Sequence, residues 1–294
     1  MLYWIGFVGL LIGLISPAVG VLFMIPAAGK ILIEQPRHTY RFFIGWILIC
    51  VLLNLINFID IVQTLNLTIG AGLSCLILFH LMKKEYQLNQ IFMSLLTVNT
   101  FFIIIRQLLF SEIIFYQYSK AADEAVSIMS NRFVYNSEQY LVFMELIEMS
   151  KTFYMRYSPG IWVSCMMLCL MLGYYLLSRK RSELSSIKLY QTHNYVIYGL
   201  IIALLISIFP DYRVYSINFL IALLPLFLIQ GLGVLIVKIG KWFSHSKILL
   251  IVAVLSIVIN PYLILLISVI GLFDGWFDFR NLSKSEDLHE SHSN

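Results

Sequence analysis

The sequence predicts an all-α protein that crosses a membrane many times. Its 294 residues are 60% hydrophobic and only 12% charged, whereas a soluble domain carries roughly 25% charged residues. Uncharged stretches of about 20 residues recur along the chain, which is the length that an α-helix needs to span a bilayer. These stretches lack the period-2 alternation of barrel strands. We therefore expect a polytopic transmembrane helix bundle with about eight spans.

Six apolar stretches form the core of this prediction. They are residues 42–60, 65–82, 88–110, 158–178, 192–209 and 215–238. Asp60 is the single charge in the first 41-residue apolar run, Phe42–Met82, and it marks the turn between the first two spans. The run is long enough for two spans, which supports a turn at this place.

The apolar segments at the two ends of the chain contain proline. Met1–Gly29 contains Pro17 and Pro26, and Ile248–Phe273 contains Asn260-Pro261. Proline removes a backbone donor and kinks or ends a helix. Each end is therefore either one kinked span or a hairpin of two short helices. Residues 1–280 are predicted to form one transmembrane domain, and the polar tail 281–294 to be disordered.

The basic residues predict which loops face the cytoplasm of a bacterial inner membrane. Four alternate loops hold twelve Lys and Arg, and the intervening loops hold five. The four basic loops are 28–42, 83–90, 179–190 and 238–247. Because cytoplasmic loops are enriched in Lys and Arg, these four are predicted to be cytoplasmic and the loop at 111–157 extracytoplasmic.

The loop at 111–157 is the long connection of the predicted bundle. It holds six acidic and four basic residues. Apolar residues recur at helical spacing after Asn136, and Asn136 with Gln139 resembles a helix capping box. We expect an amphipathic helix there. It either caps the bundle or acts as a lid over a substrate.

Motifs of catalysis and of metal or cofactor binding are absent from the sequence. Zinc-protease, hydrolase-elbow and phosphate-loop patterns do not occur. The basic residues do not form the stripe of a nucleic-acid-binding protein. All four cysteines lie in apolar runs, which is typical of packing residues, although Cys165 and Cys169 are one helical turn apart and leave a metal pair as the alternative. The sequence predicts no enzyme, metal, cofactor or nucleic-acid partner, and the lipid bilayer as its surroundings.

Polar residues at membrane depth mark a candidate binding site. A charge within a span is costly and usually faces a bundle interior or a cavity. Arg106 lies in the outer half of the third core span, with Asn99 seven residues before it. Asn54, Asn57 and Asp60 recur every three residues at the outer end of the first span. We expect an Arg106–Asp60 ion pair, lined by the asparagines, that binds a ligand. In the alternative, Arg106 snorkels to headgroups or only holds helices together.

The C-terminal segment combines aromatic and charged residues. Trp276, Phe277 and Phe279 suit a membrane interface. Arg280 is placed to pair with Asp274 or Asp278, or to bind lipid phosphate. An intramembrane enzyme acting on lipid would require the two aspartates to face one cavity together.

This ending also carries a family resemblance. Gly271, Asp274, Trp276 and the run Phe277-Asp278-Phe279-Arg280 resemble the closing signature of the YybS-like family of predicted bacterial membrane proteins. Gln230-Gly231, together with Pro17, Gly20 and Pro26, resembles that family's pattern. The family is distantly similar to the S-components of energy-coupling factor transporters. Those are small helical bundles that bind vitamins or metal ions and dock on a shared ATPase module.

The sequence therefore leaves two main hypotheses for function. The first is a membrane component that binds or transports a small solute, resembles an S-component, and works with a separate ATPase and coupling module. The second is a membrane interaction or assembly protein that does not transport and that holds a partner through its loops.

Overall fold

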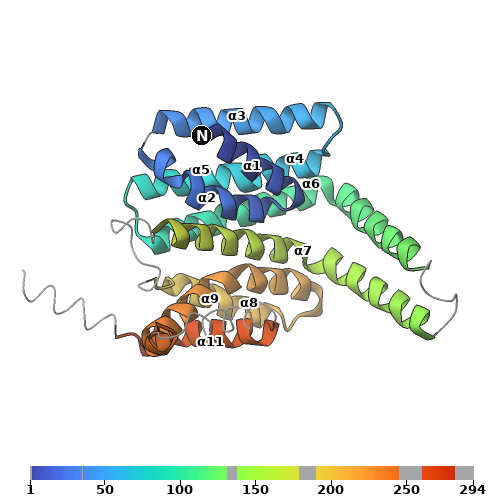
Figure 1. Cartoon of the computed structure of the whole chain (residues 1–294). Helices are drawn as coiled ribbons and strands as arrows, with labels where there is room; N and C mark the ends of the chain where they lie inside the picture. The colour runs from blue at the N-terminus through green and yellow to red at the C-terminus, as the bar shows by residue number, and fades with distance from the viewer. Residues whose placement is uncertain (1, 35, 131–137, 179–189, 245–259, 282–294) are drawn as a thin grey trace, which may run out of the picture.

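All regular structure in the described part of the chain is helical (Figure 1). The computed structural model describes residues 2–34, 36–130, 138–178, 190–244 and 260–281. Its elements are α1 (Leu2–Ile15), α2 (Pro17–Glu34), α3 (Pro36–Leu55), α4 (Ile61–Leu65), the π-helix η1 (Asn66–Leu73), α5 (Ser74–Lys83), α6 (Leu88–Ser130), α7 (Glu138–Ser178), α8 (Asn194–Ile206), the 3-10 helix η3 (Pro210–Tyr212), α9 (Arg213–Ser244) and α11 (Pro261–Phe277). Each predicted core span overlaps a helix, which confirms the all-α class.

Several of these helices suit a membrane by length and composition. Among the described residues, the segments long and apolar enough to cross a bilayer are Ile61–Lys83, Leu88–Ile128, Glu138–Ser178 and Pro210–Lys238. Tyr40–Leu55, Asn194–Ile206 and Tyr262–Phe277 are shorter apolar helices. α8 has 13 residues and is therefore only about 20 Å long. The predicted span 192–209 was too long, because His193 caps the start of α8. The total of about eight spans stays a prediction.

The apolar segment at the start of the chain folds as two helices that pack against each other. Pro17 begins α2 directly after α1 ends. The two helices approach closely at Gly20, where a Cβ would lie 2.8 Å from the Gly13 Cα and the Gly9 carbonyl oxygen. Small residues permit such contact between helix backbones. At the other end, Asn260 caps α11, and residues 248–259 lie outside the described part of the chain.

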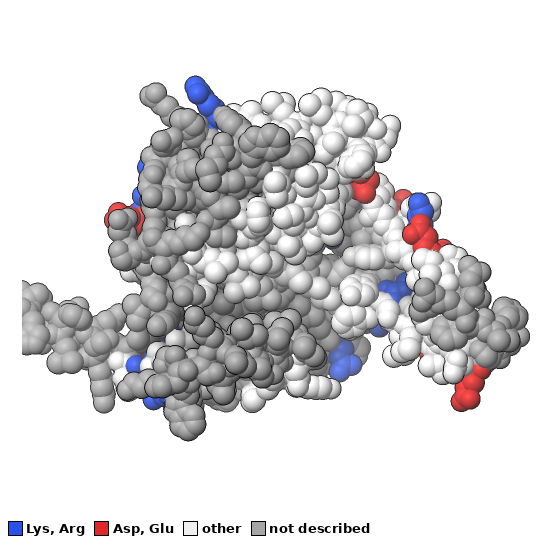
Figure 2. All heavy atoms as spheres, viewed as in Figure 1, with Lys and Arg blue, Asp and Glu red and all other residues white. Residues whose placement is uncertain are grey.

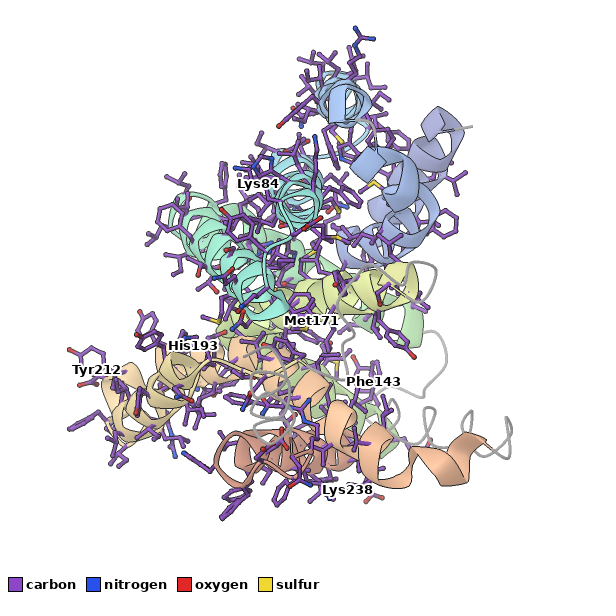
Figure 3. All side chains as sticks on the ribbon, turned by 90° about the vertical axis from the view of Figure 1, so that its left-hand side faces the viewer. Lys84, Phe143, Met171, His193, Tyr212 and Lys238 are labelled. Carbon is purple, nitrogen blue, oxygen red and sulfur yellow. The ribbon has the colours of Figure 1, made fainter. Side chains whose placement is uncertain are left out.

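α7 lies between two groups of helices. It packs against α2 and α6 on one side and against α9 on the other. α9 in turn packs against α8 and α11. Viewed along the helices, the fully buried Met171 of α7 lies between the two groups (Figure 3). The core is therefore continuous through α7.

The helix ends that lead into the four basic loops lie at one end of the molecule. The C-terminal ends of α2, α5, α7 and α9 all lie on the left of Figure 1. Lys84 caps the end of α5, His193 precedes α8 and Lys238 lies in the last two turns of α9 (labelled in Figure 3). The predicted alternation of the loops agrees with this arrangement, whereas the side of the membrane that this end faces stays a prediction. Residues 28–34 and 238–244, predicted as loop, are helical in α2 and α9, whereas residues 179–189 and 245–247 lie outside the described part of the chain.

α6 and α7 continue past the bundle as a projecting pair of helices, on the right of Figure 1. We call residues 111–130 of α6 and 138–157 of α7 the arm. The helix predicted after Asn136 falls within α7, and residues 111–130 of α6 are helical as well. The rings of Tyr118 and Tyr154 stack at 6.2 Å across the arm. Acidic side chains are visible along the arm (Figure 2), and the predicted cap at Asn136 lies outside the described residues.

Both helices of the arm bend where they leave the bundle. In α6 the bend is at Phe110, whose φ of −126° and ψ of 21° are not helical. In α7 it is at Pro159, where Asn218 of α9 inserts into the helix. Asn218 Nδ2 donates to the Arg156 carbonyl oxygen at 2.7 Å, and its Oδ1 accepts from the Gly160 N–H at 2.8 Å. This side chain replaces one backbone hydrogen bond of the helix, which is a recognised cause of a kink.

Candidate functional site

Arg106 is buried in α6, one helical turn before the bend at Phe110. Its side chain is 4% exposed. Nη1 donates to Asn66 Oδ1 at 2.8 Å, and the guanidinium carbon lies 5.7 Å from the centre of the Trp162 ring. Nε is buried and has no hydrogen-bond partner. Within the described ranges, no carboxylate forms an ion pair with Arg106.

The partners of Arg106 are held by a π-helix and by close packing. Asn66 is the first residue of η1, and π-helical turns are rare and frequent at functional sites. Trp162 of α7 lies against Gly70 of the same π-helix, where a Cβ would come within 2.7 Å of the indole ring. Trp46 Nε1 donates to the Leu67 carbonyl oxygen at 3.0 Å and so ties η1 to α3. These contacts fix the surroundings of the guanidinium.

An open cleft of about 380 Å³ lies at the base of the arm. It is lined by Gln107, Ser111, Glu112, Ile114, Phe115, Tyr118 and Met155. Gln107 Oε1 is buried without a hydrogen-bond partner. Tyr118, in the same lining, stacks on Tyr154 across the arm. Gln107 directly follows Arg106 in α6, so the cleft lies next to the helix turn that carries the buried charge, although Arg106 itself is not in the lining.

The predicted ion pair between Arg106 and Asp60 is not formed, and the predicted polar stripe was wrong. α3 ends at Leu55, so Asn54, Asn57 and Asp60 do not share a helix face. Asn54 Nδ2 donates to the Ile59 carbonyl oxygen at 3.0 Å. Asn57 has a φ of 56°, a left-handed conformation that asparagine tolerates. Asp60 caps α4, where its Oδ1 accepts from the Gln63 N–H at 2.8 Å.

Asn99 is fully buried on α6 but does not reach Arg106 through a hydrogen bond. Its Nδ2 donates to Ser74 Oγ at 3.0 Å and to the Leu95 carbonyl oxygen at 2.8 Å. Seven residues of helix separate Asn99 from Arg106, which is about 10 Å. Asn99 therefore joins α6 to α5. Of the predicted set, only Arg106 is next in sequence to a residue that lines the cleft, Gln107.

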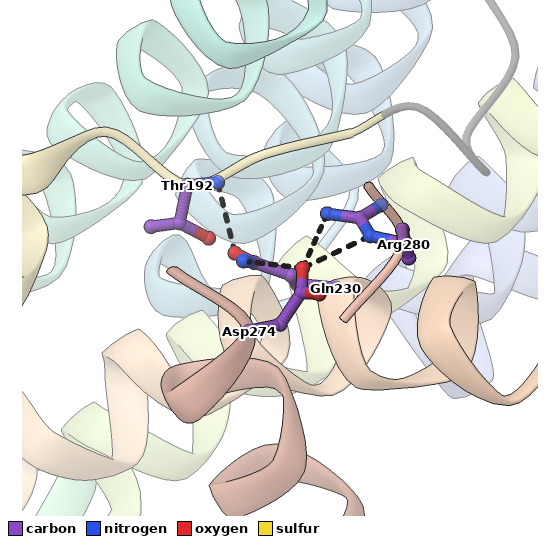
Figure 4. A network of polar contacts seen from close by, with 4 residues as sticks. All are labelled: Thr192, Gln230, Asp274 and Arg280. Carbon is purple, nitrogen blue, oxygen red and sulfur yellow. Dashed lines mark hydrogen bonds and ion pairs between the residues drawn. The ribbon is translucent and has the colours of Figure 1, made fainter. Parts of the chain in front are cut away.

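A second buried polar network lies around Asp274 (Figure 4). Asp274 Oδ2 lies 2.6 Å from Arg280 Nη2 and accepts from Arg280 Nε at 2.9 Å. It also accepts from Gln230 Nε2 at 3.1 Å, and Gln230 Oε1 accepts from the Thr192 N–H at 2.9 Å. Asp274, one of the two predicted partners of Arg280, forms an ion pair with it. The network joins α9, α11, the segment before α8 and the segment after α11.

The turn after α11 brings Arg280 back onto the helix. Asp278 has a φ of 43° and its N–H donates to the Asp274 carbonyl oxygen at 3.0 Å. This left-handed residue ends the helix. The aromatic residues of the segment stay on the surface, where Phe277 and Phe279 stack at 5.7 Å.

Comparison with known protein families shows the family to which the chain belongs. Residues 4–275 match the family described as "Predicted membrane protein (DUF2232)". The chain belongs to this family. No curated protein and no solved structure matches it.

Membership in DUF2232 confirms that the chain is a membrane protein of an uncharacterised family. The matched range contains Arg106, Gly231, Gly271 and Asp274, and it ends before the last residues of the closing signature. The narrower resemblance to YybS-like proteins and to S-components stays a prediction.

Four residues of the Arg106 site escaped the sequence analysis. Asn66 lies inside an apolar span next to two threonines, and Gln107 directly follows Arg106. A search for polar residues in spans finds both of them. Tyr118, which lines the cleft, and Trp162, which contacts Arg106, carry no comparable signal, because their positions depend on the bends of α6 and α7.

Proposed function

We propose that the protein is a membrane-embedded component that binds a small solute at the base of its arm. One observation carries this proposal: a buried arginine with an unpartnered Nε in a membrane-spanning helix, directly followed by Gln107 in the lining of an open cleft. An ionisable residue at membrane depth marks a functional site by default, because burying it is costly. Asn66 and Trp162 offset only part of this cost, since neither carries a charge.

The proposed solute site belongs to a transport system. The sequence contains no nucleotide-binding motif, so active transport requires a separate ATPase and coupling protein. This part of the proposal rests on the resemblance of the sequence to S-components. We also propose that the protein is not an enzyme. Asp274 is buried against Arg280, which favours a structural role for it over the pair of aspartates that lipid chemistry would require.

The first experiment is gentle affinity purification from native membranes, followed by mass spectrometry of bound proteins and small molecules. The wild-type protein is compared with Arg106→Gln and with Arg213→Gln, which removes an exposed charge at the start of α9. We expect a solute to be retained by wild type and by Arg213→Gln and to be lost from Arg106→Gln. Equal retention by all three proteins would contradict a role for Arg106. A co-purifying ATPase would support the transport role.

The arm favours a second function, which is interaction with another protein. Val142, Leu146, Met149 and Phe153 recur along α7 and are between 50% and 62% exposed. Such a row of apolar residues is typical of a helix that meets another helix. Deleting residues 118–150 would then release a partner while the bundle stays folded. Retention of every partner after this deletion would refute the second function.

A further inference from the structure

We infer that the solute carries one negative charge on a carboxylate or phosphate group and that this group pairs with Arg106. The inference rests on the proposed function and names the chemical class of its ligand. It follows from the charge balance of the site, the geometry of the cleft and the residues along its mouth.

The charge of Arg106 is not balanced by the groups that touch it. The guanidinium stays protonated in proteins. Asn66 supplies one neutral acceptor at 2.8 Å, and the Trp162 ring supplies a cation–π contact. Buried charges are usually paired with an opposite charge. The unpartnered Nε and the absence of an ion pair in the described structure therefore point to an anion from outside the chain.

Among the residues that the structure describes, no carboxylate forms an ion pair with Arg106. Asp60 is used as the cap of α4. Glu112 is exposed and lines the cleft. Residues 131–137, which connect the helices of the arm, contain neither Asp nor Glu. An oxyanion is the natural ligand, because the planar guanidinium matches carboxylate and phosphate groups.

The cleft limits the charge of the ligand. Gln107, Ser111 and Tyr118 supply neutral polar groups, which suit a hydrated or hydroxylated solute. Glu112 adds a negative charge to the same lining and repels anions. A ligand with two negative charges is therefore disfavoured, whereas a group with one charge that reaches Arg106 is neutralised there. Both a water-soluble anion and the phosphate of a lipid headgroup have this chemistry.

The test uses the fluorescence of Trp162, which lies next to the guanidinium. The full-length protein in nanodiscs of phosphatidylcholine is titrated at constant ionic strength with sodium benzoate and with dimethyl phosphate, a phosphodiester that carries one negative charge. Benzamide serves as a neutral probe of the same shape as benzoate. The titrations are repeated for Arg106→Gln, Arg106→Lys and Trp162→Phe. Lipids retained from native membranes by wild type and Arg106→Gln are compared by mass spectrometry.

We expect a saturable fluorescence change with an anion and none with benzamide. The change should be absent in Trp162→Phe, and Arg106→Gln should bind more than about tenfold more weakly. Arg106→Lys, which keeps the charge, should retain part of the binding and shows that the site is folded.

If the natural ligand is a water-soluble anion, the titrations give the result described above. If it is a lipid, mass spectrometry finds an anionic phospholipid bound to wild type and lost from Arg106→Gln. A retained solute that is neutral and survives Arg106→Gln would overturn the inference and leave the proposed function standing. Absence of any bound solute, lipid or anion would overturn both.

Discussion

Asp274 accepts three contacts on one oxygen, from Arg280 Nε, Arg280 Nη2 and Gln230. Both charged side chains are almost completely buried. Removing one member of such a pair leaves an uncompensated charge, which costs about 3–5 kcal/mol. We predict that Asp274→Asn lowers the free energy of unfolding by about this amount. Thermal or denaturant unfolding in detergent measures it, and Asp211→Asn, at an exposed position, is the control.

The double variant Asp274→Asn with Arg280→Gln separates the ion pair from its burial cost. With both charges removed, the penalty for an unpaired buried charge disappears. We therefore predict that the double variant is more stable than either single variant. Additive losses would show that the two side chains act independently and would contradict the network. If Asp274 instead took part in solute binding, Asp274→Asn would also change the amount of ligand that the purified protein retains.

At the scale of the helix, close contact between α9 and α11 explains why glycine stands at two positions of the predicted family resemblance, Gly231 and Gly271. A Cβ on Gly231 would overlap the Ile267 carbonyl oxygen, and one on Gly271 would overlap the Phe227 carbonyl oxygen. The two backbones therefore touch directly, and Gln230 is brought next to Asp274. Only glycine fits at both positions, because the overlapping atoms belong to backbone rather than to flexible side chains.

We predict that Gly231→Ala and Gly271→Ala each push α9 and α11 apart and weaken the Asp274 network. Overpacking of this kind costs typically about 1–3 kcal/mol. Gly45→Ala is the matched control, because open space surrounds Gly45 and alanine favours a helix by up to about 1 kcal/mol. The unfolding midpoints of the three variants give the comparison. Equal stability of all three would show that α9 and α11 do not meet at these glycines.

The sequence predicts helices well and their exact ends and bends less well. Apolar length identifies the helix at 158–178 because its last residue, Ser178, precedes a charged run. The same signal extends the first core span past Leu55, because Ile56, Phe58 and Ile59 are apolar although they form a turn. The site at Arg106 depends on such ends. Its real partners come from a π-helix and from α7, and neither has a signal in hydropathy.

At the scale of the molecule, one arrangement combines the arm, the cleft and the basic loops. The bends at Phe110 and Pro159 send the arm away from the end where the four basic loops begin (Figure 1). The cleft beside Arg106 therefore opens at the end opposite to the basic loops. If the basic end is cytoplasmic, as its Lys and Arg predict, then the solute enters from outside the cell.

This orientation gives the last prediction, which concerns two exposed positions at opposite ends of the fold. Lys84→Cys lies on the turn between α5 and α6, and Asp123→Cys lies on the arm. We expect a membrane-impermeant maleimide to label Asp123→Cys on intact cells, and Lys84→Cys only after permeabilisation. The wild-type protein is the control, because its four cysteines lie in apolar helices that a charged reagent reaches poorly. The reverse pattern would place the arm and the cleft in the cytoplasm. Labelling of both positions in intact cells would contradict the fold itself, since the arm and the basic loops would then share one side.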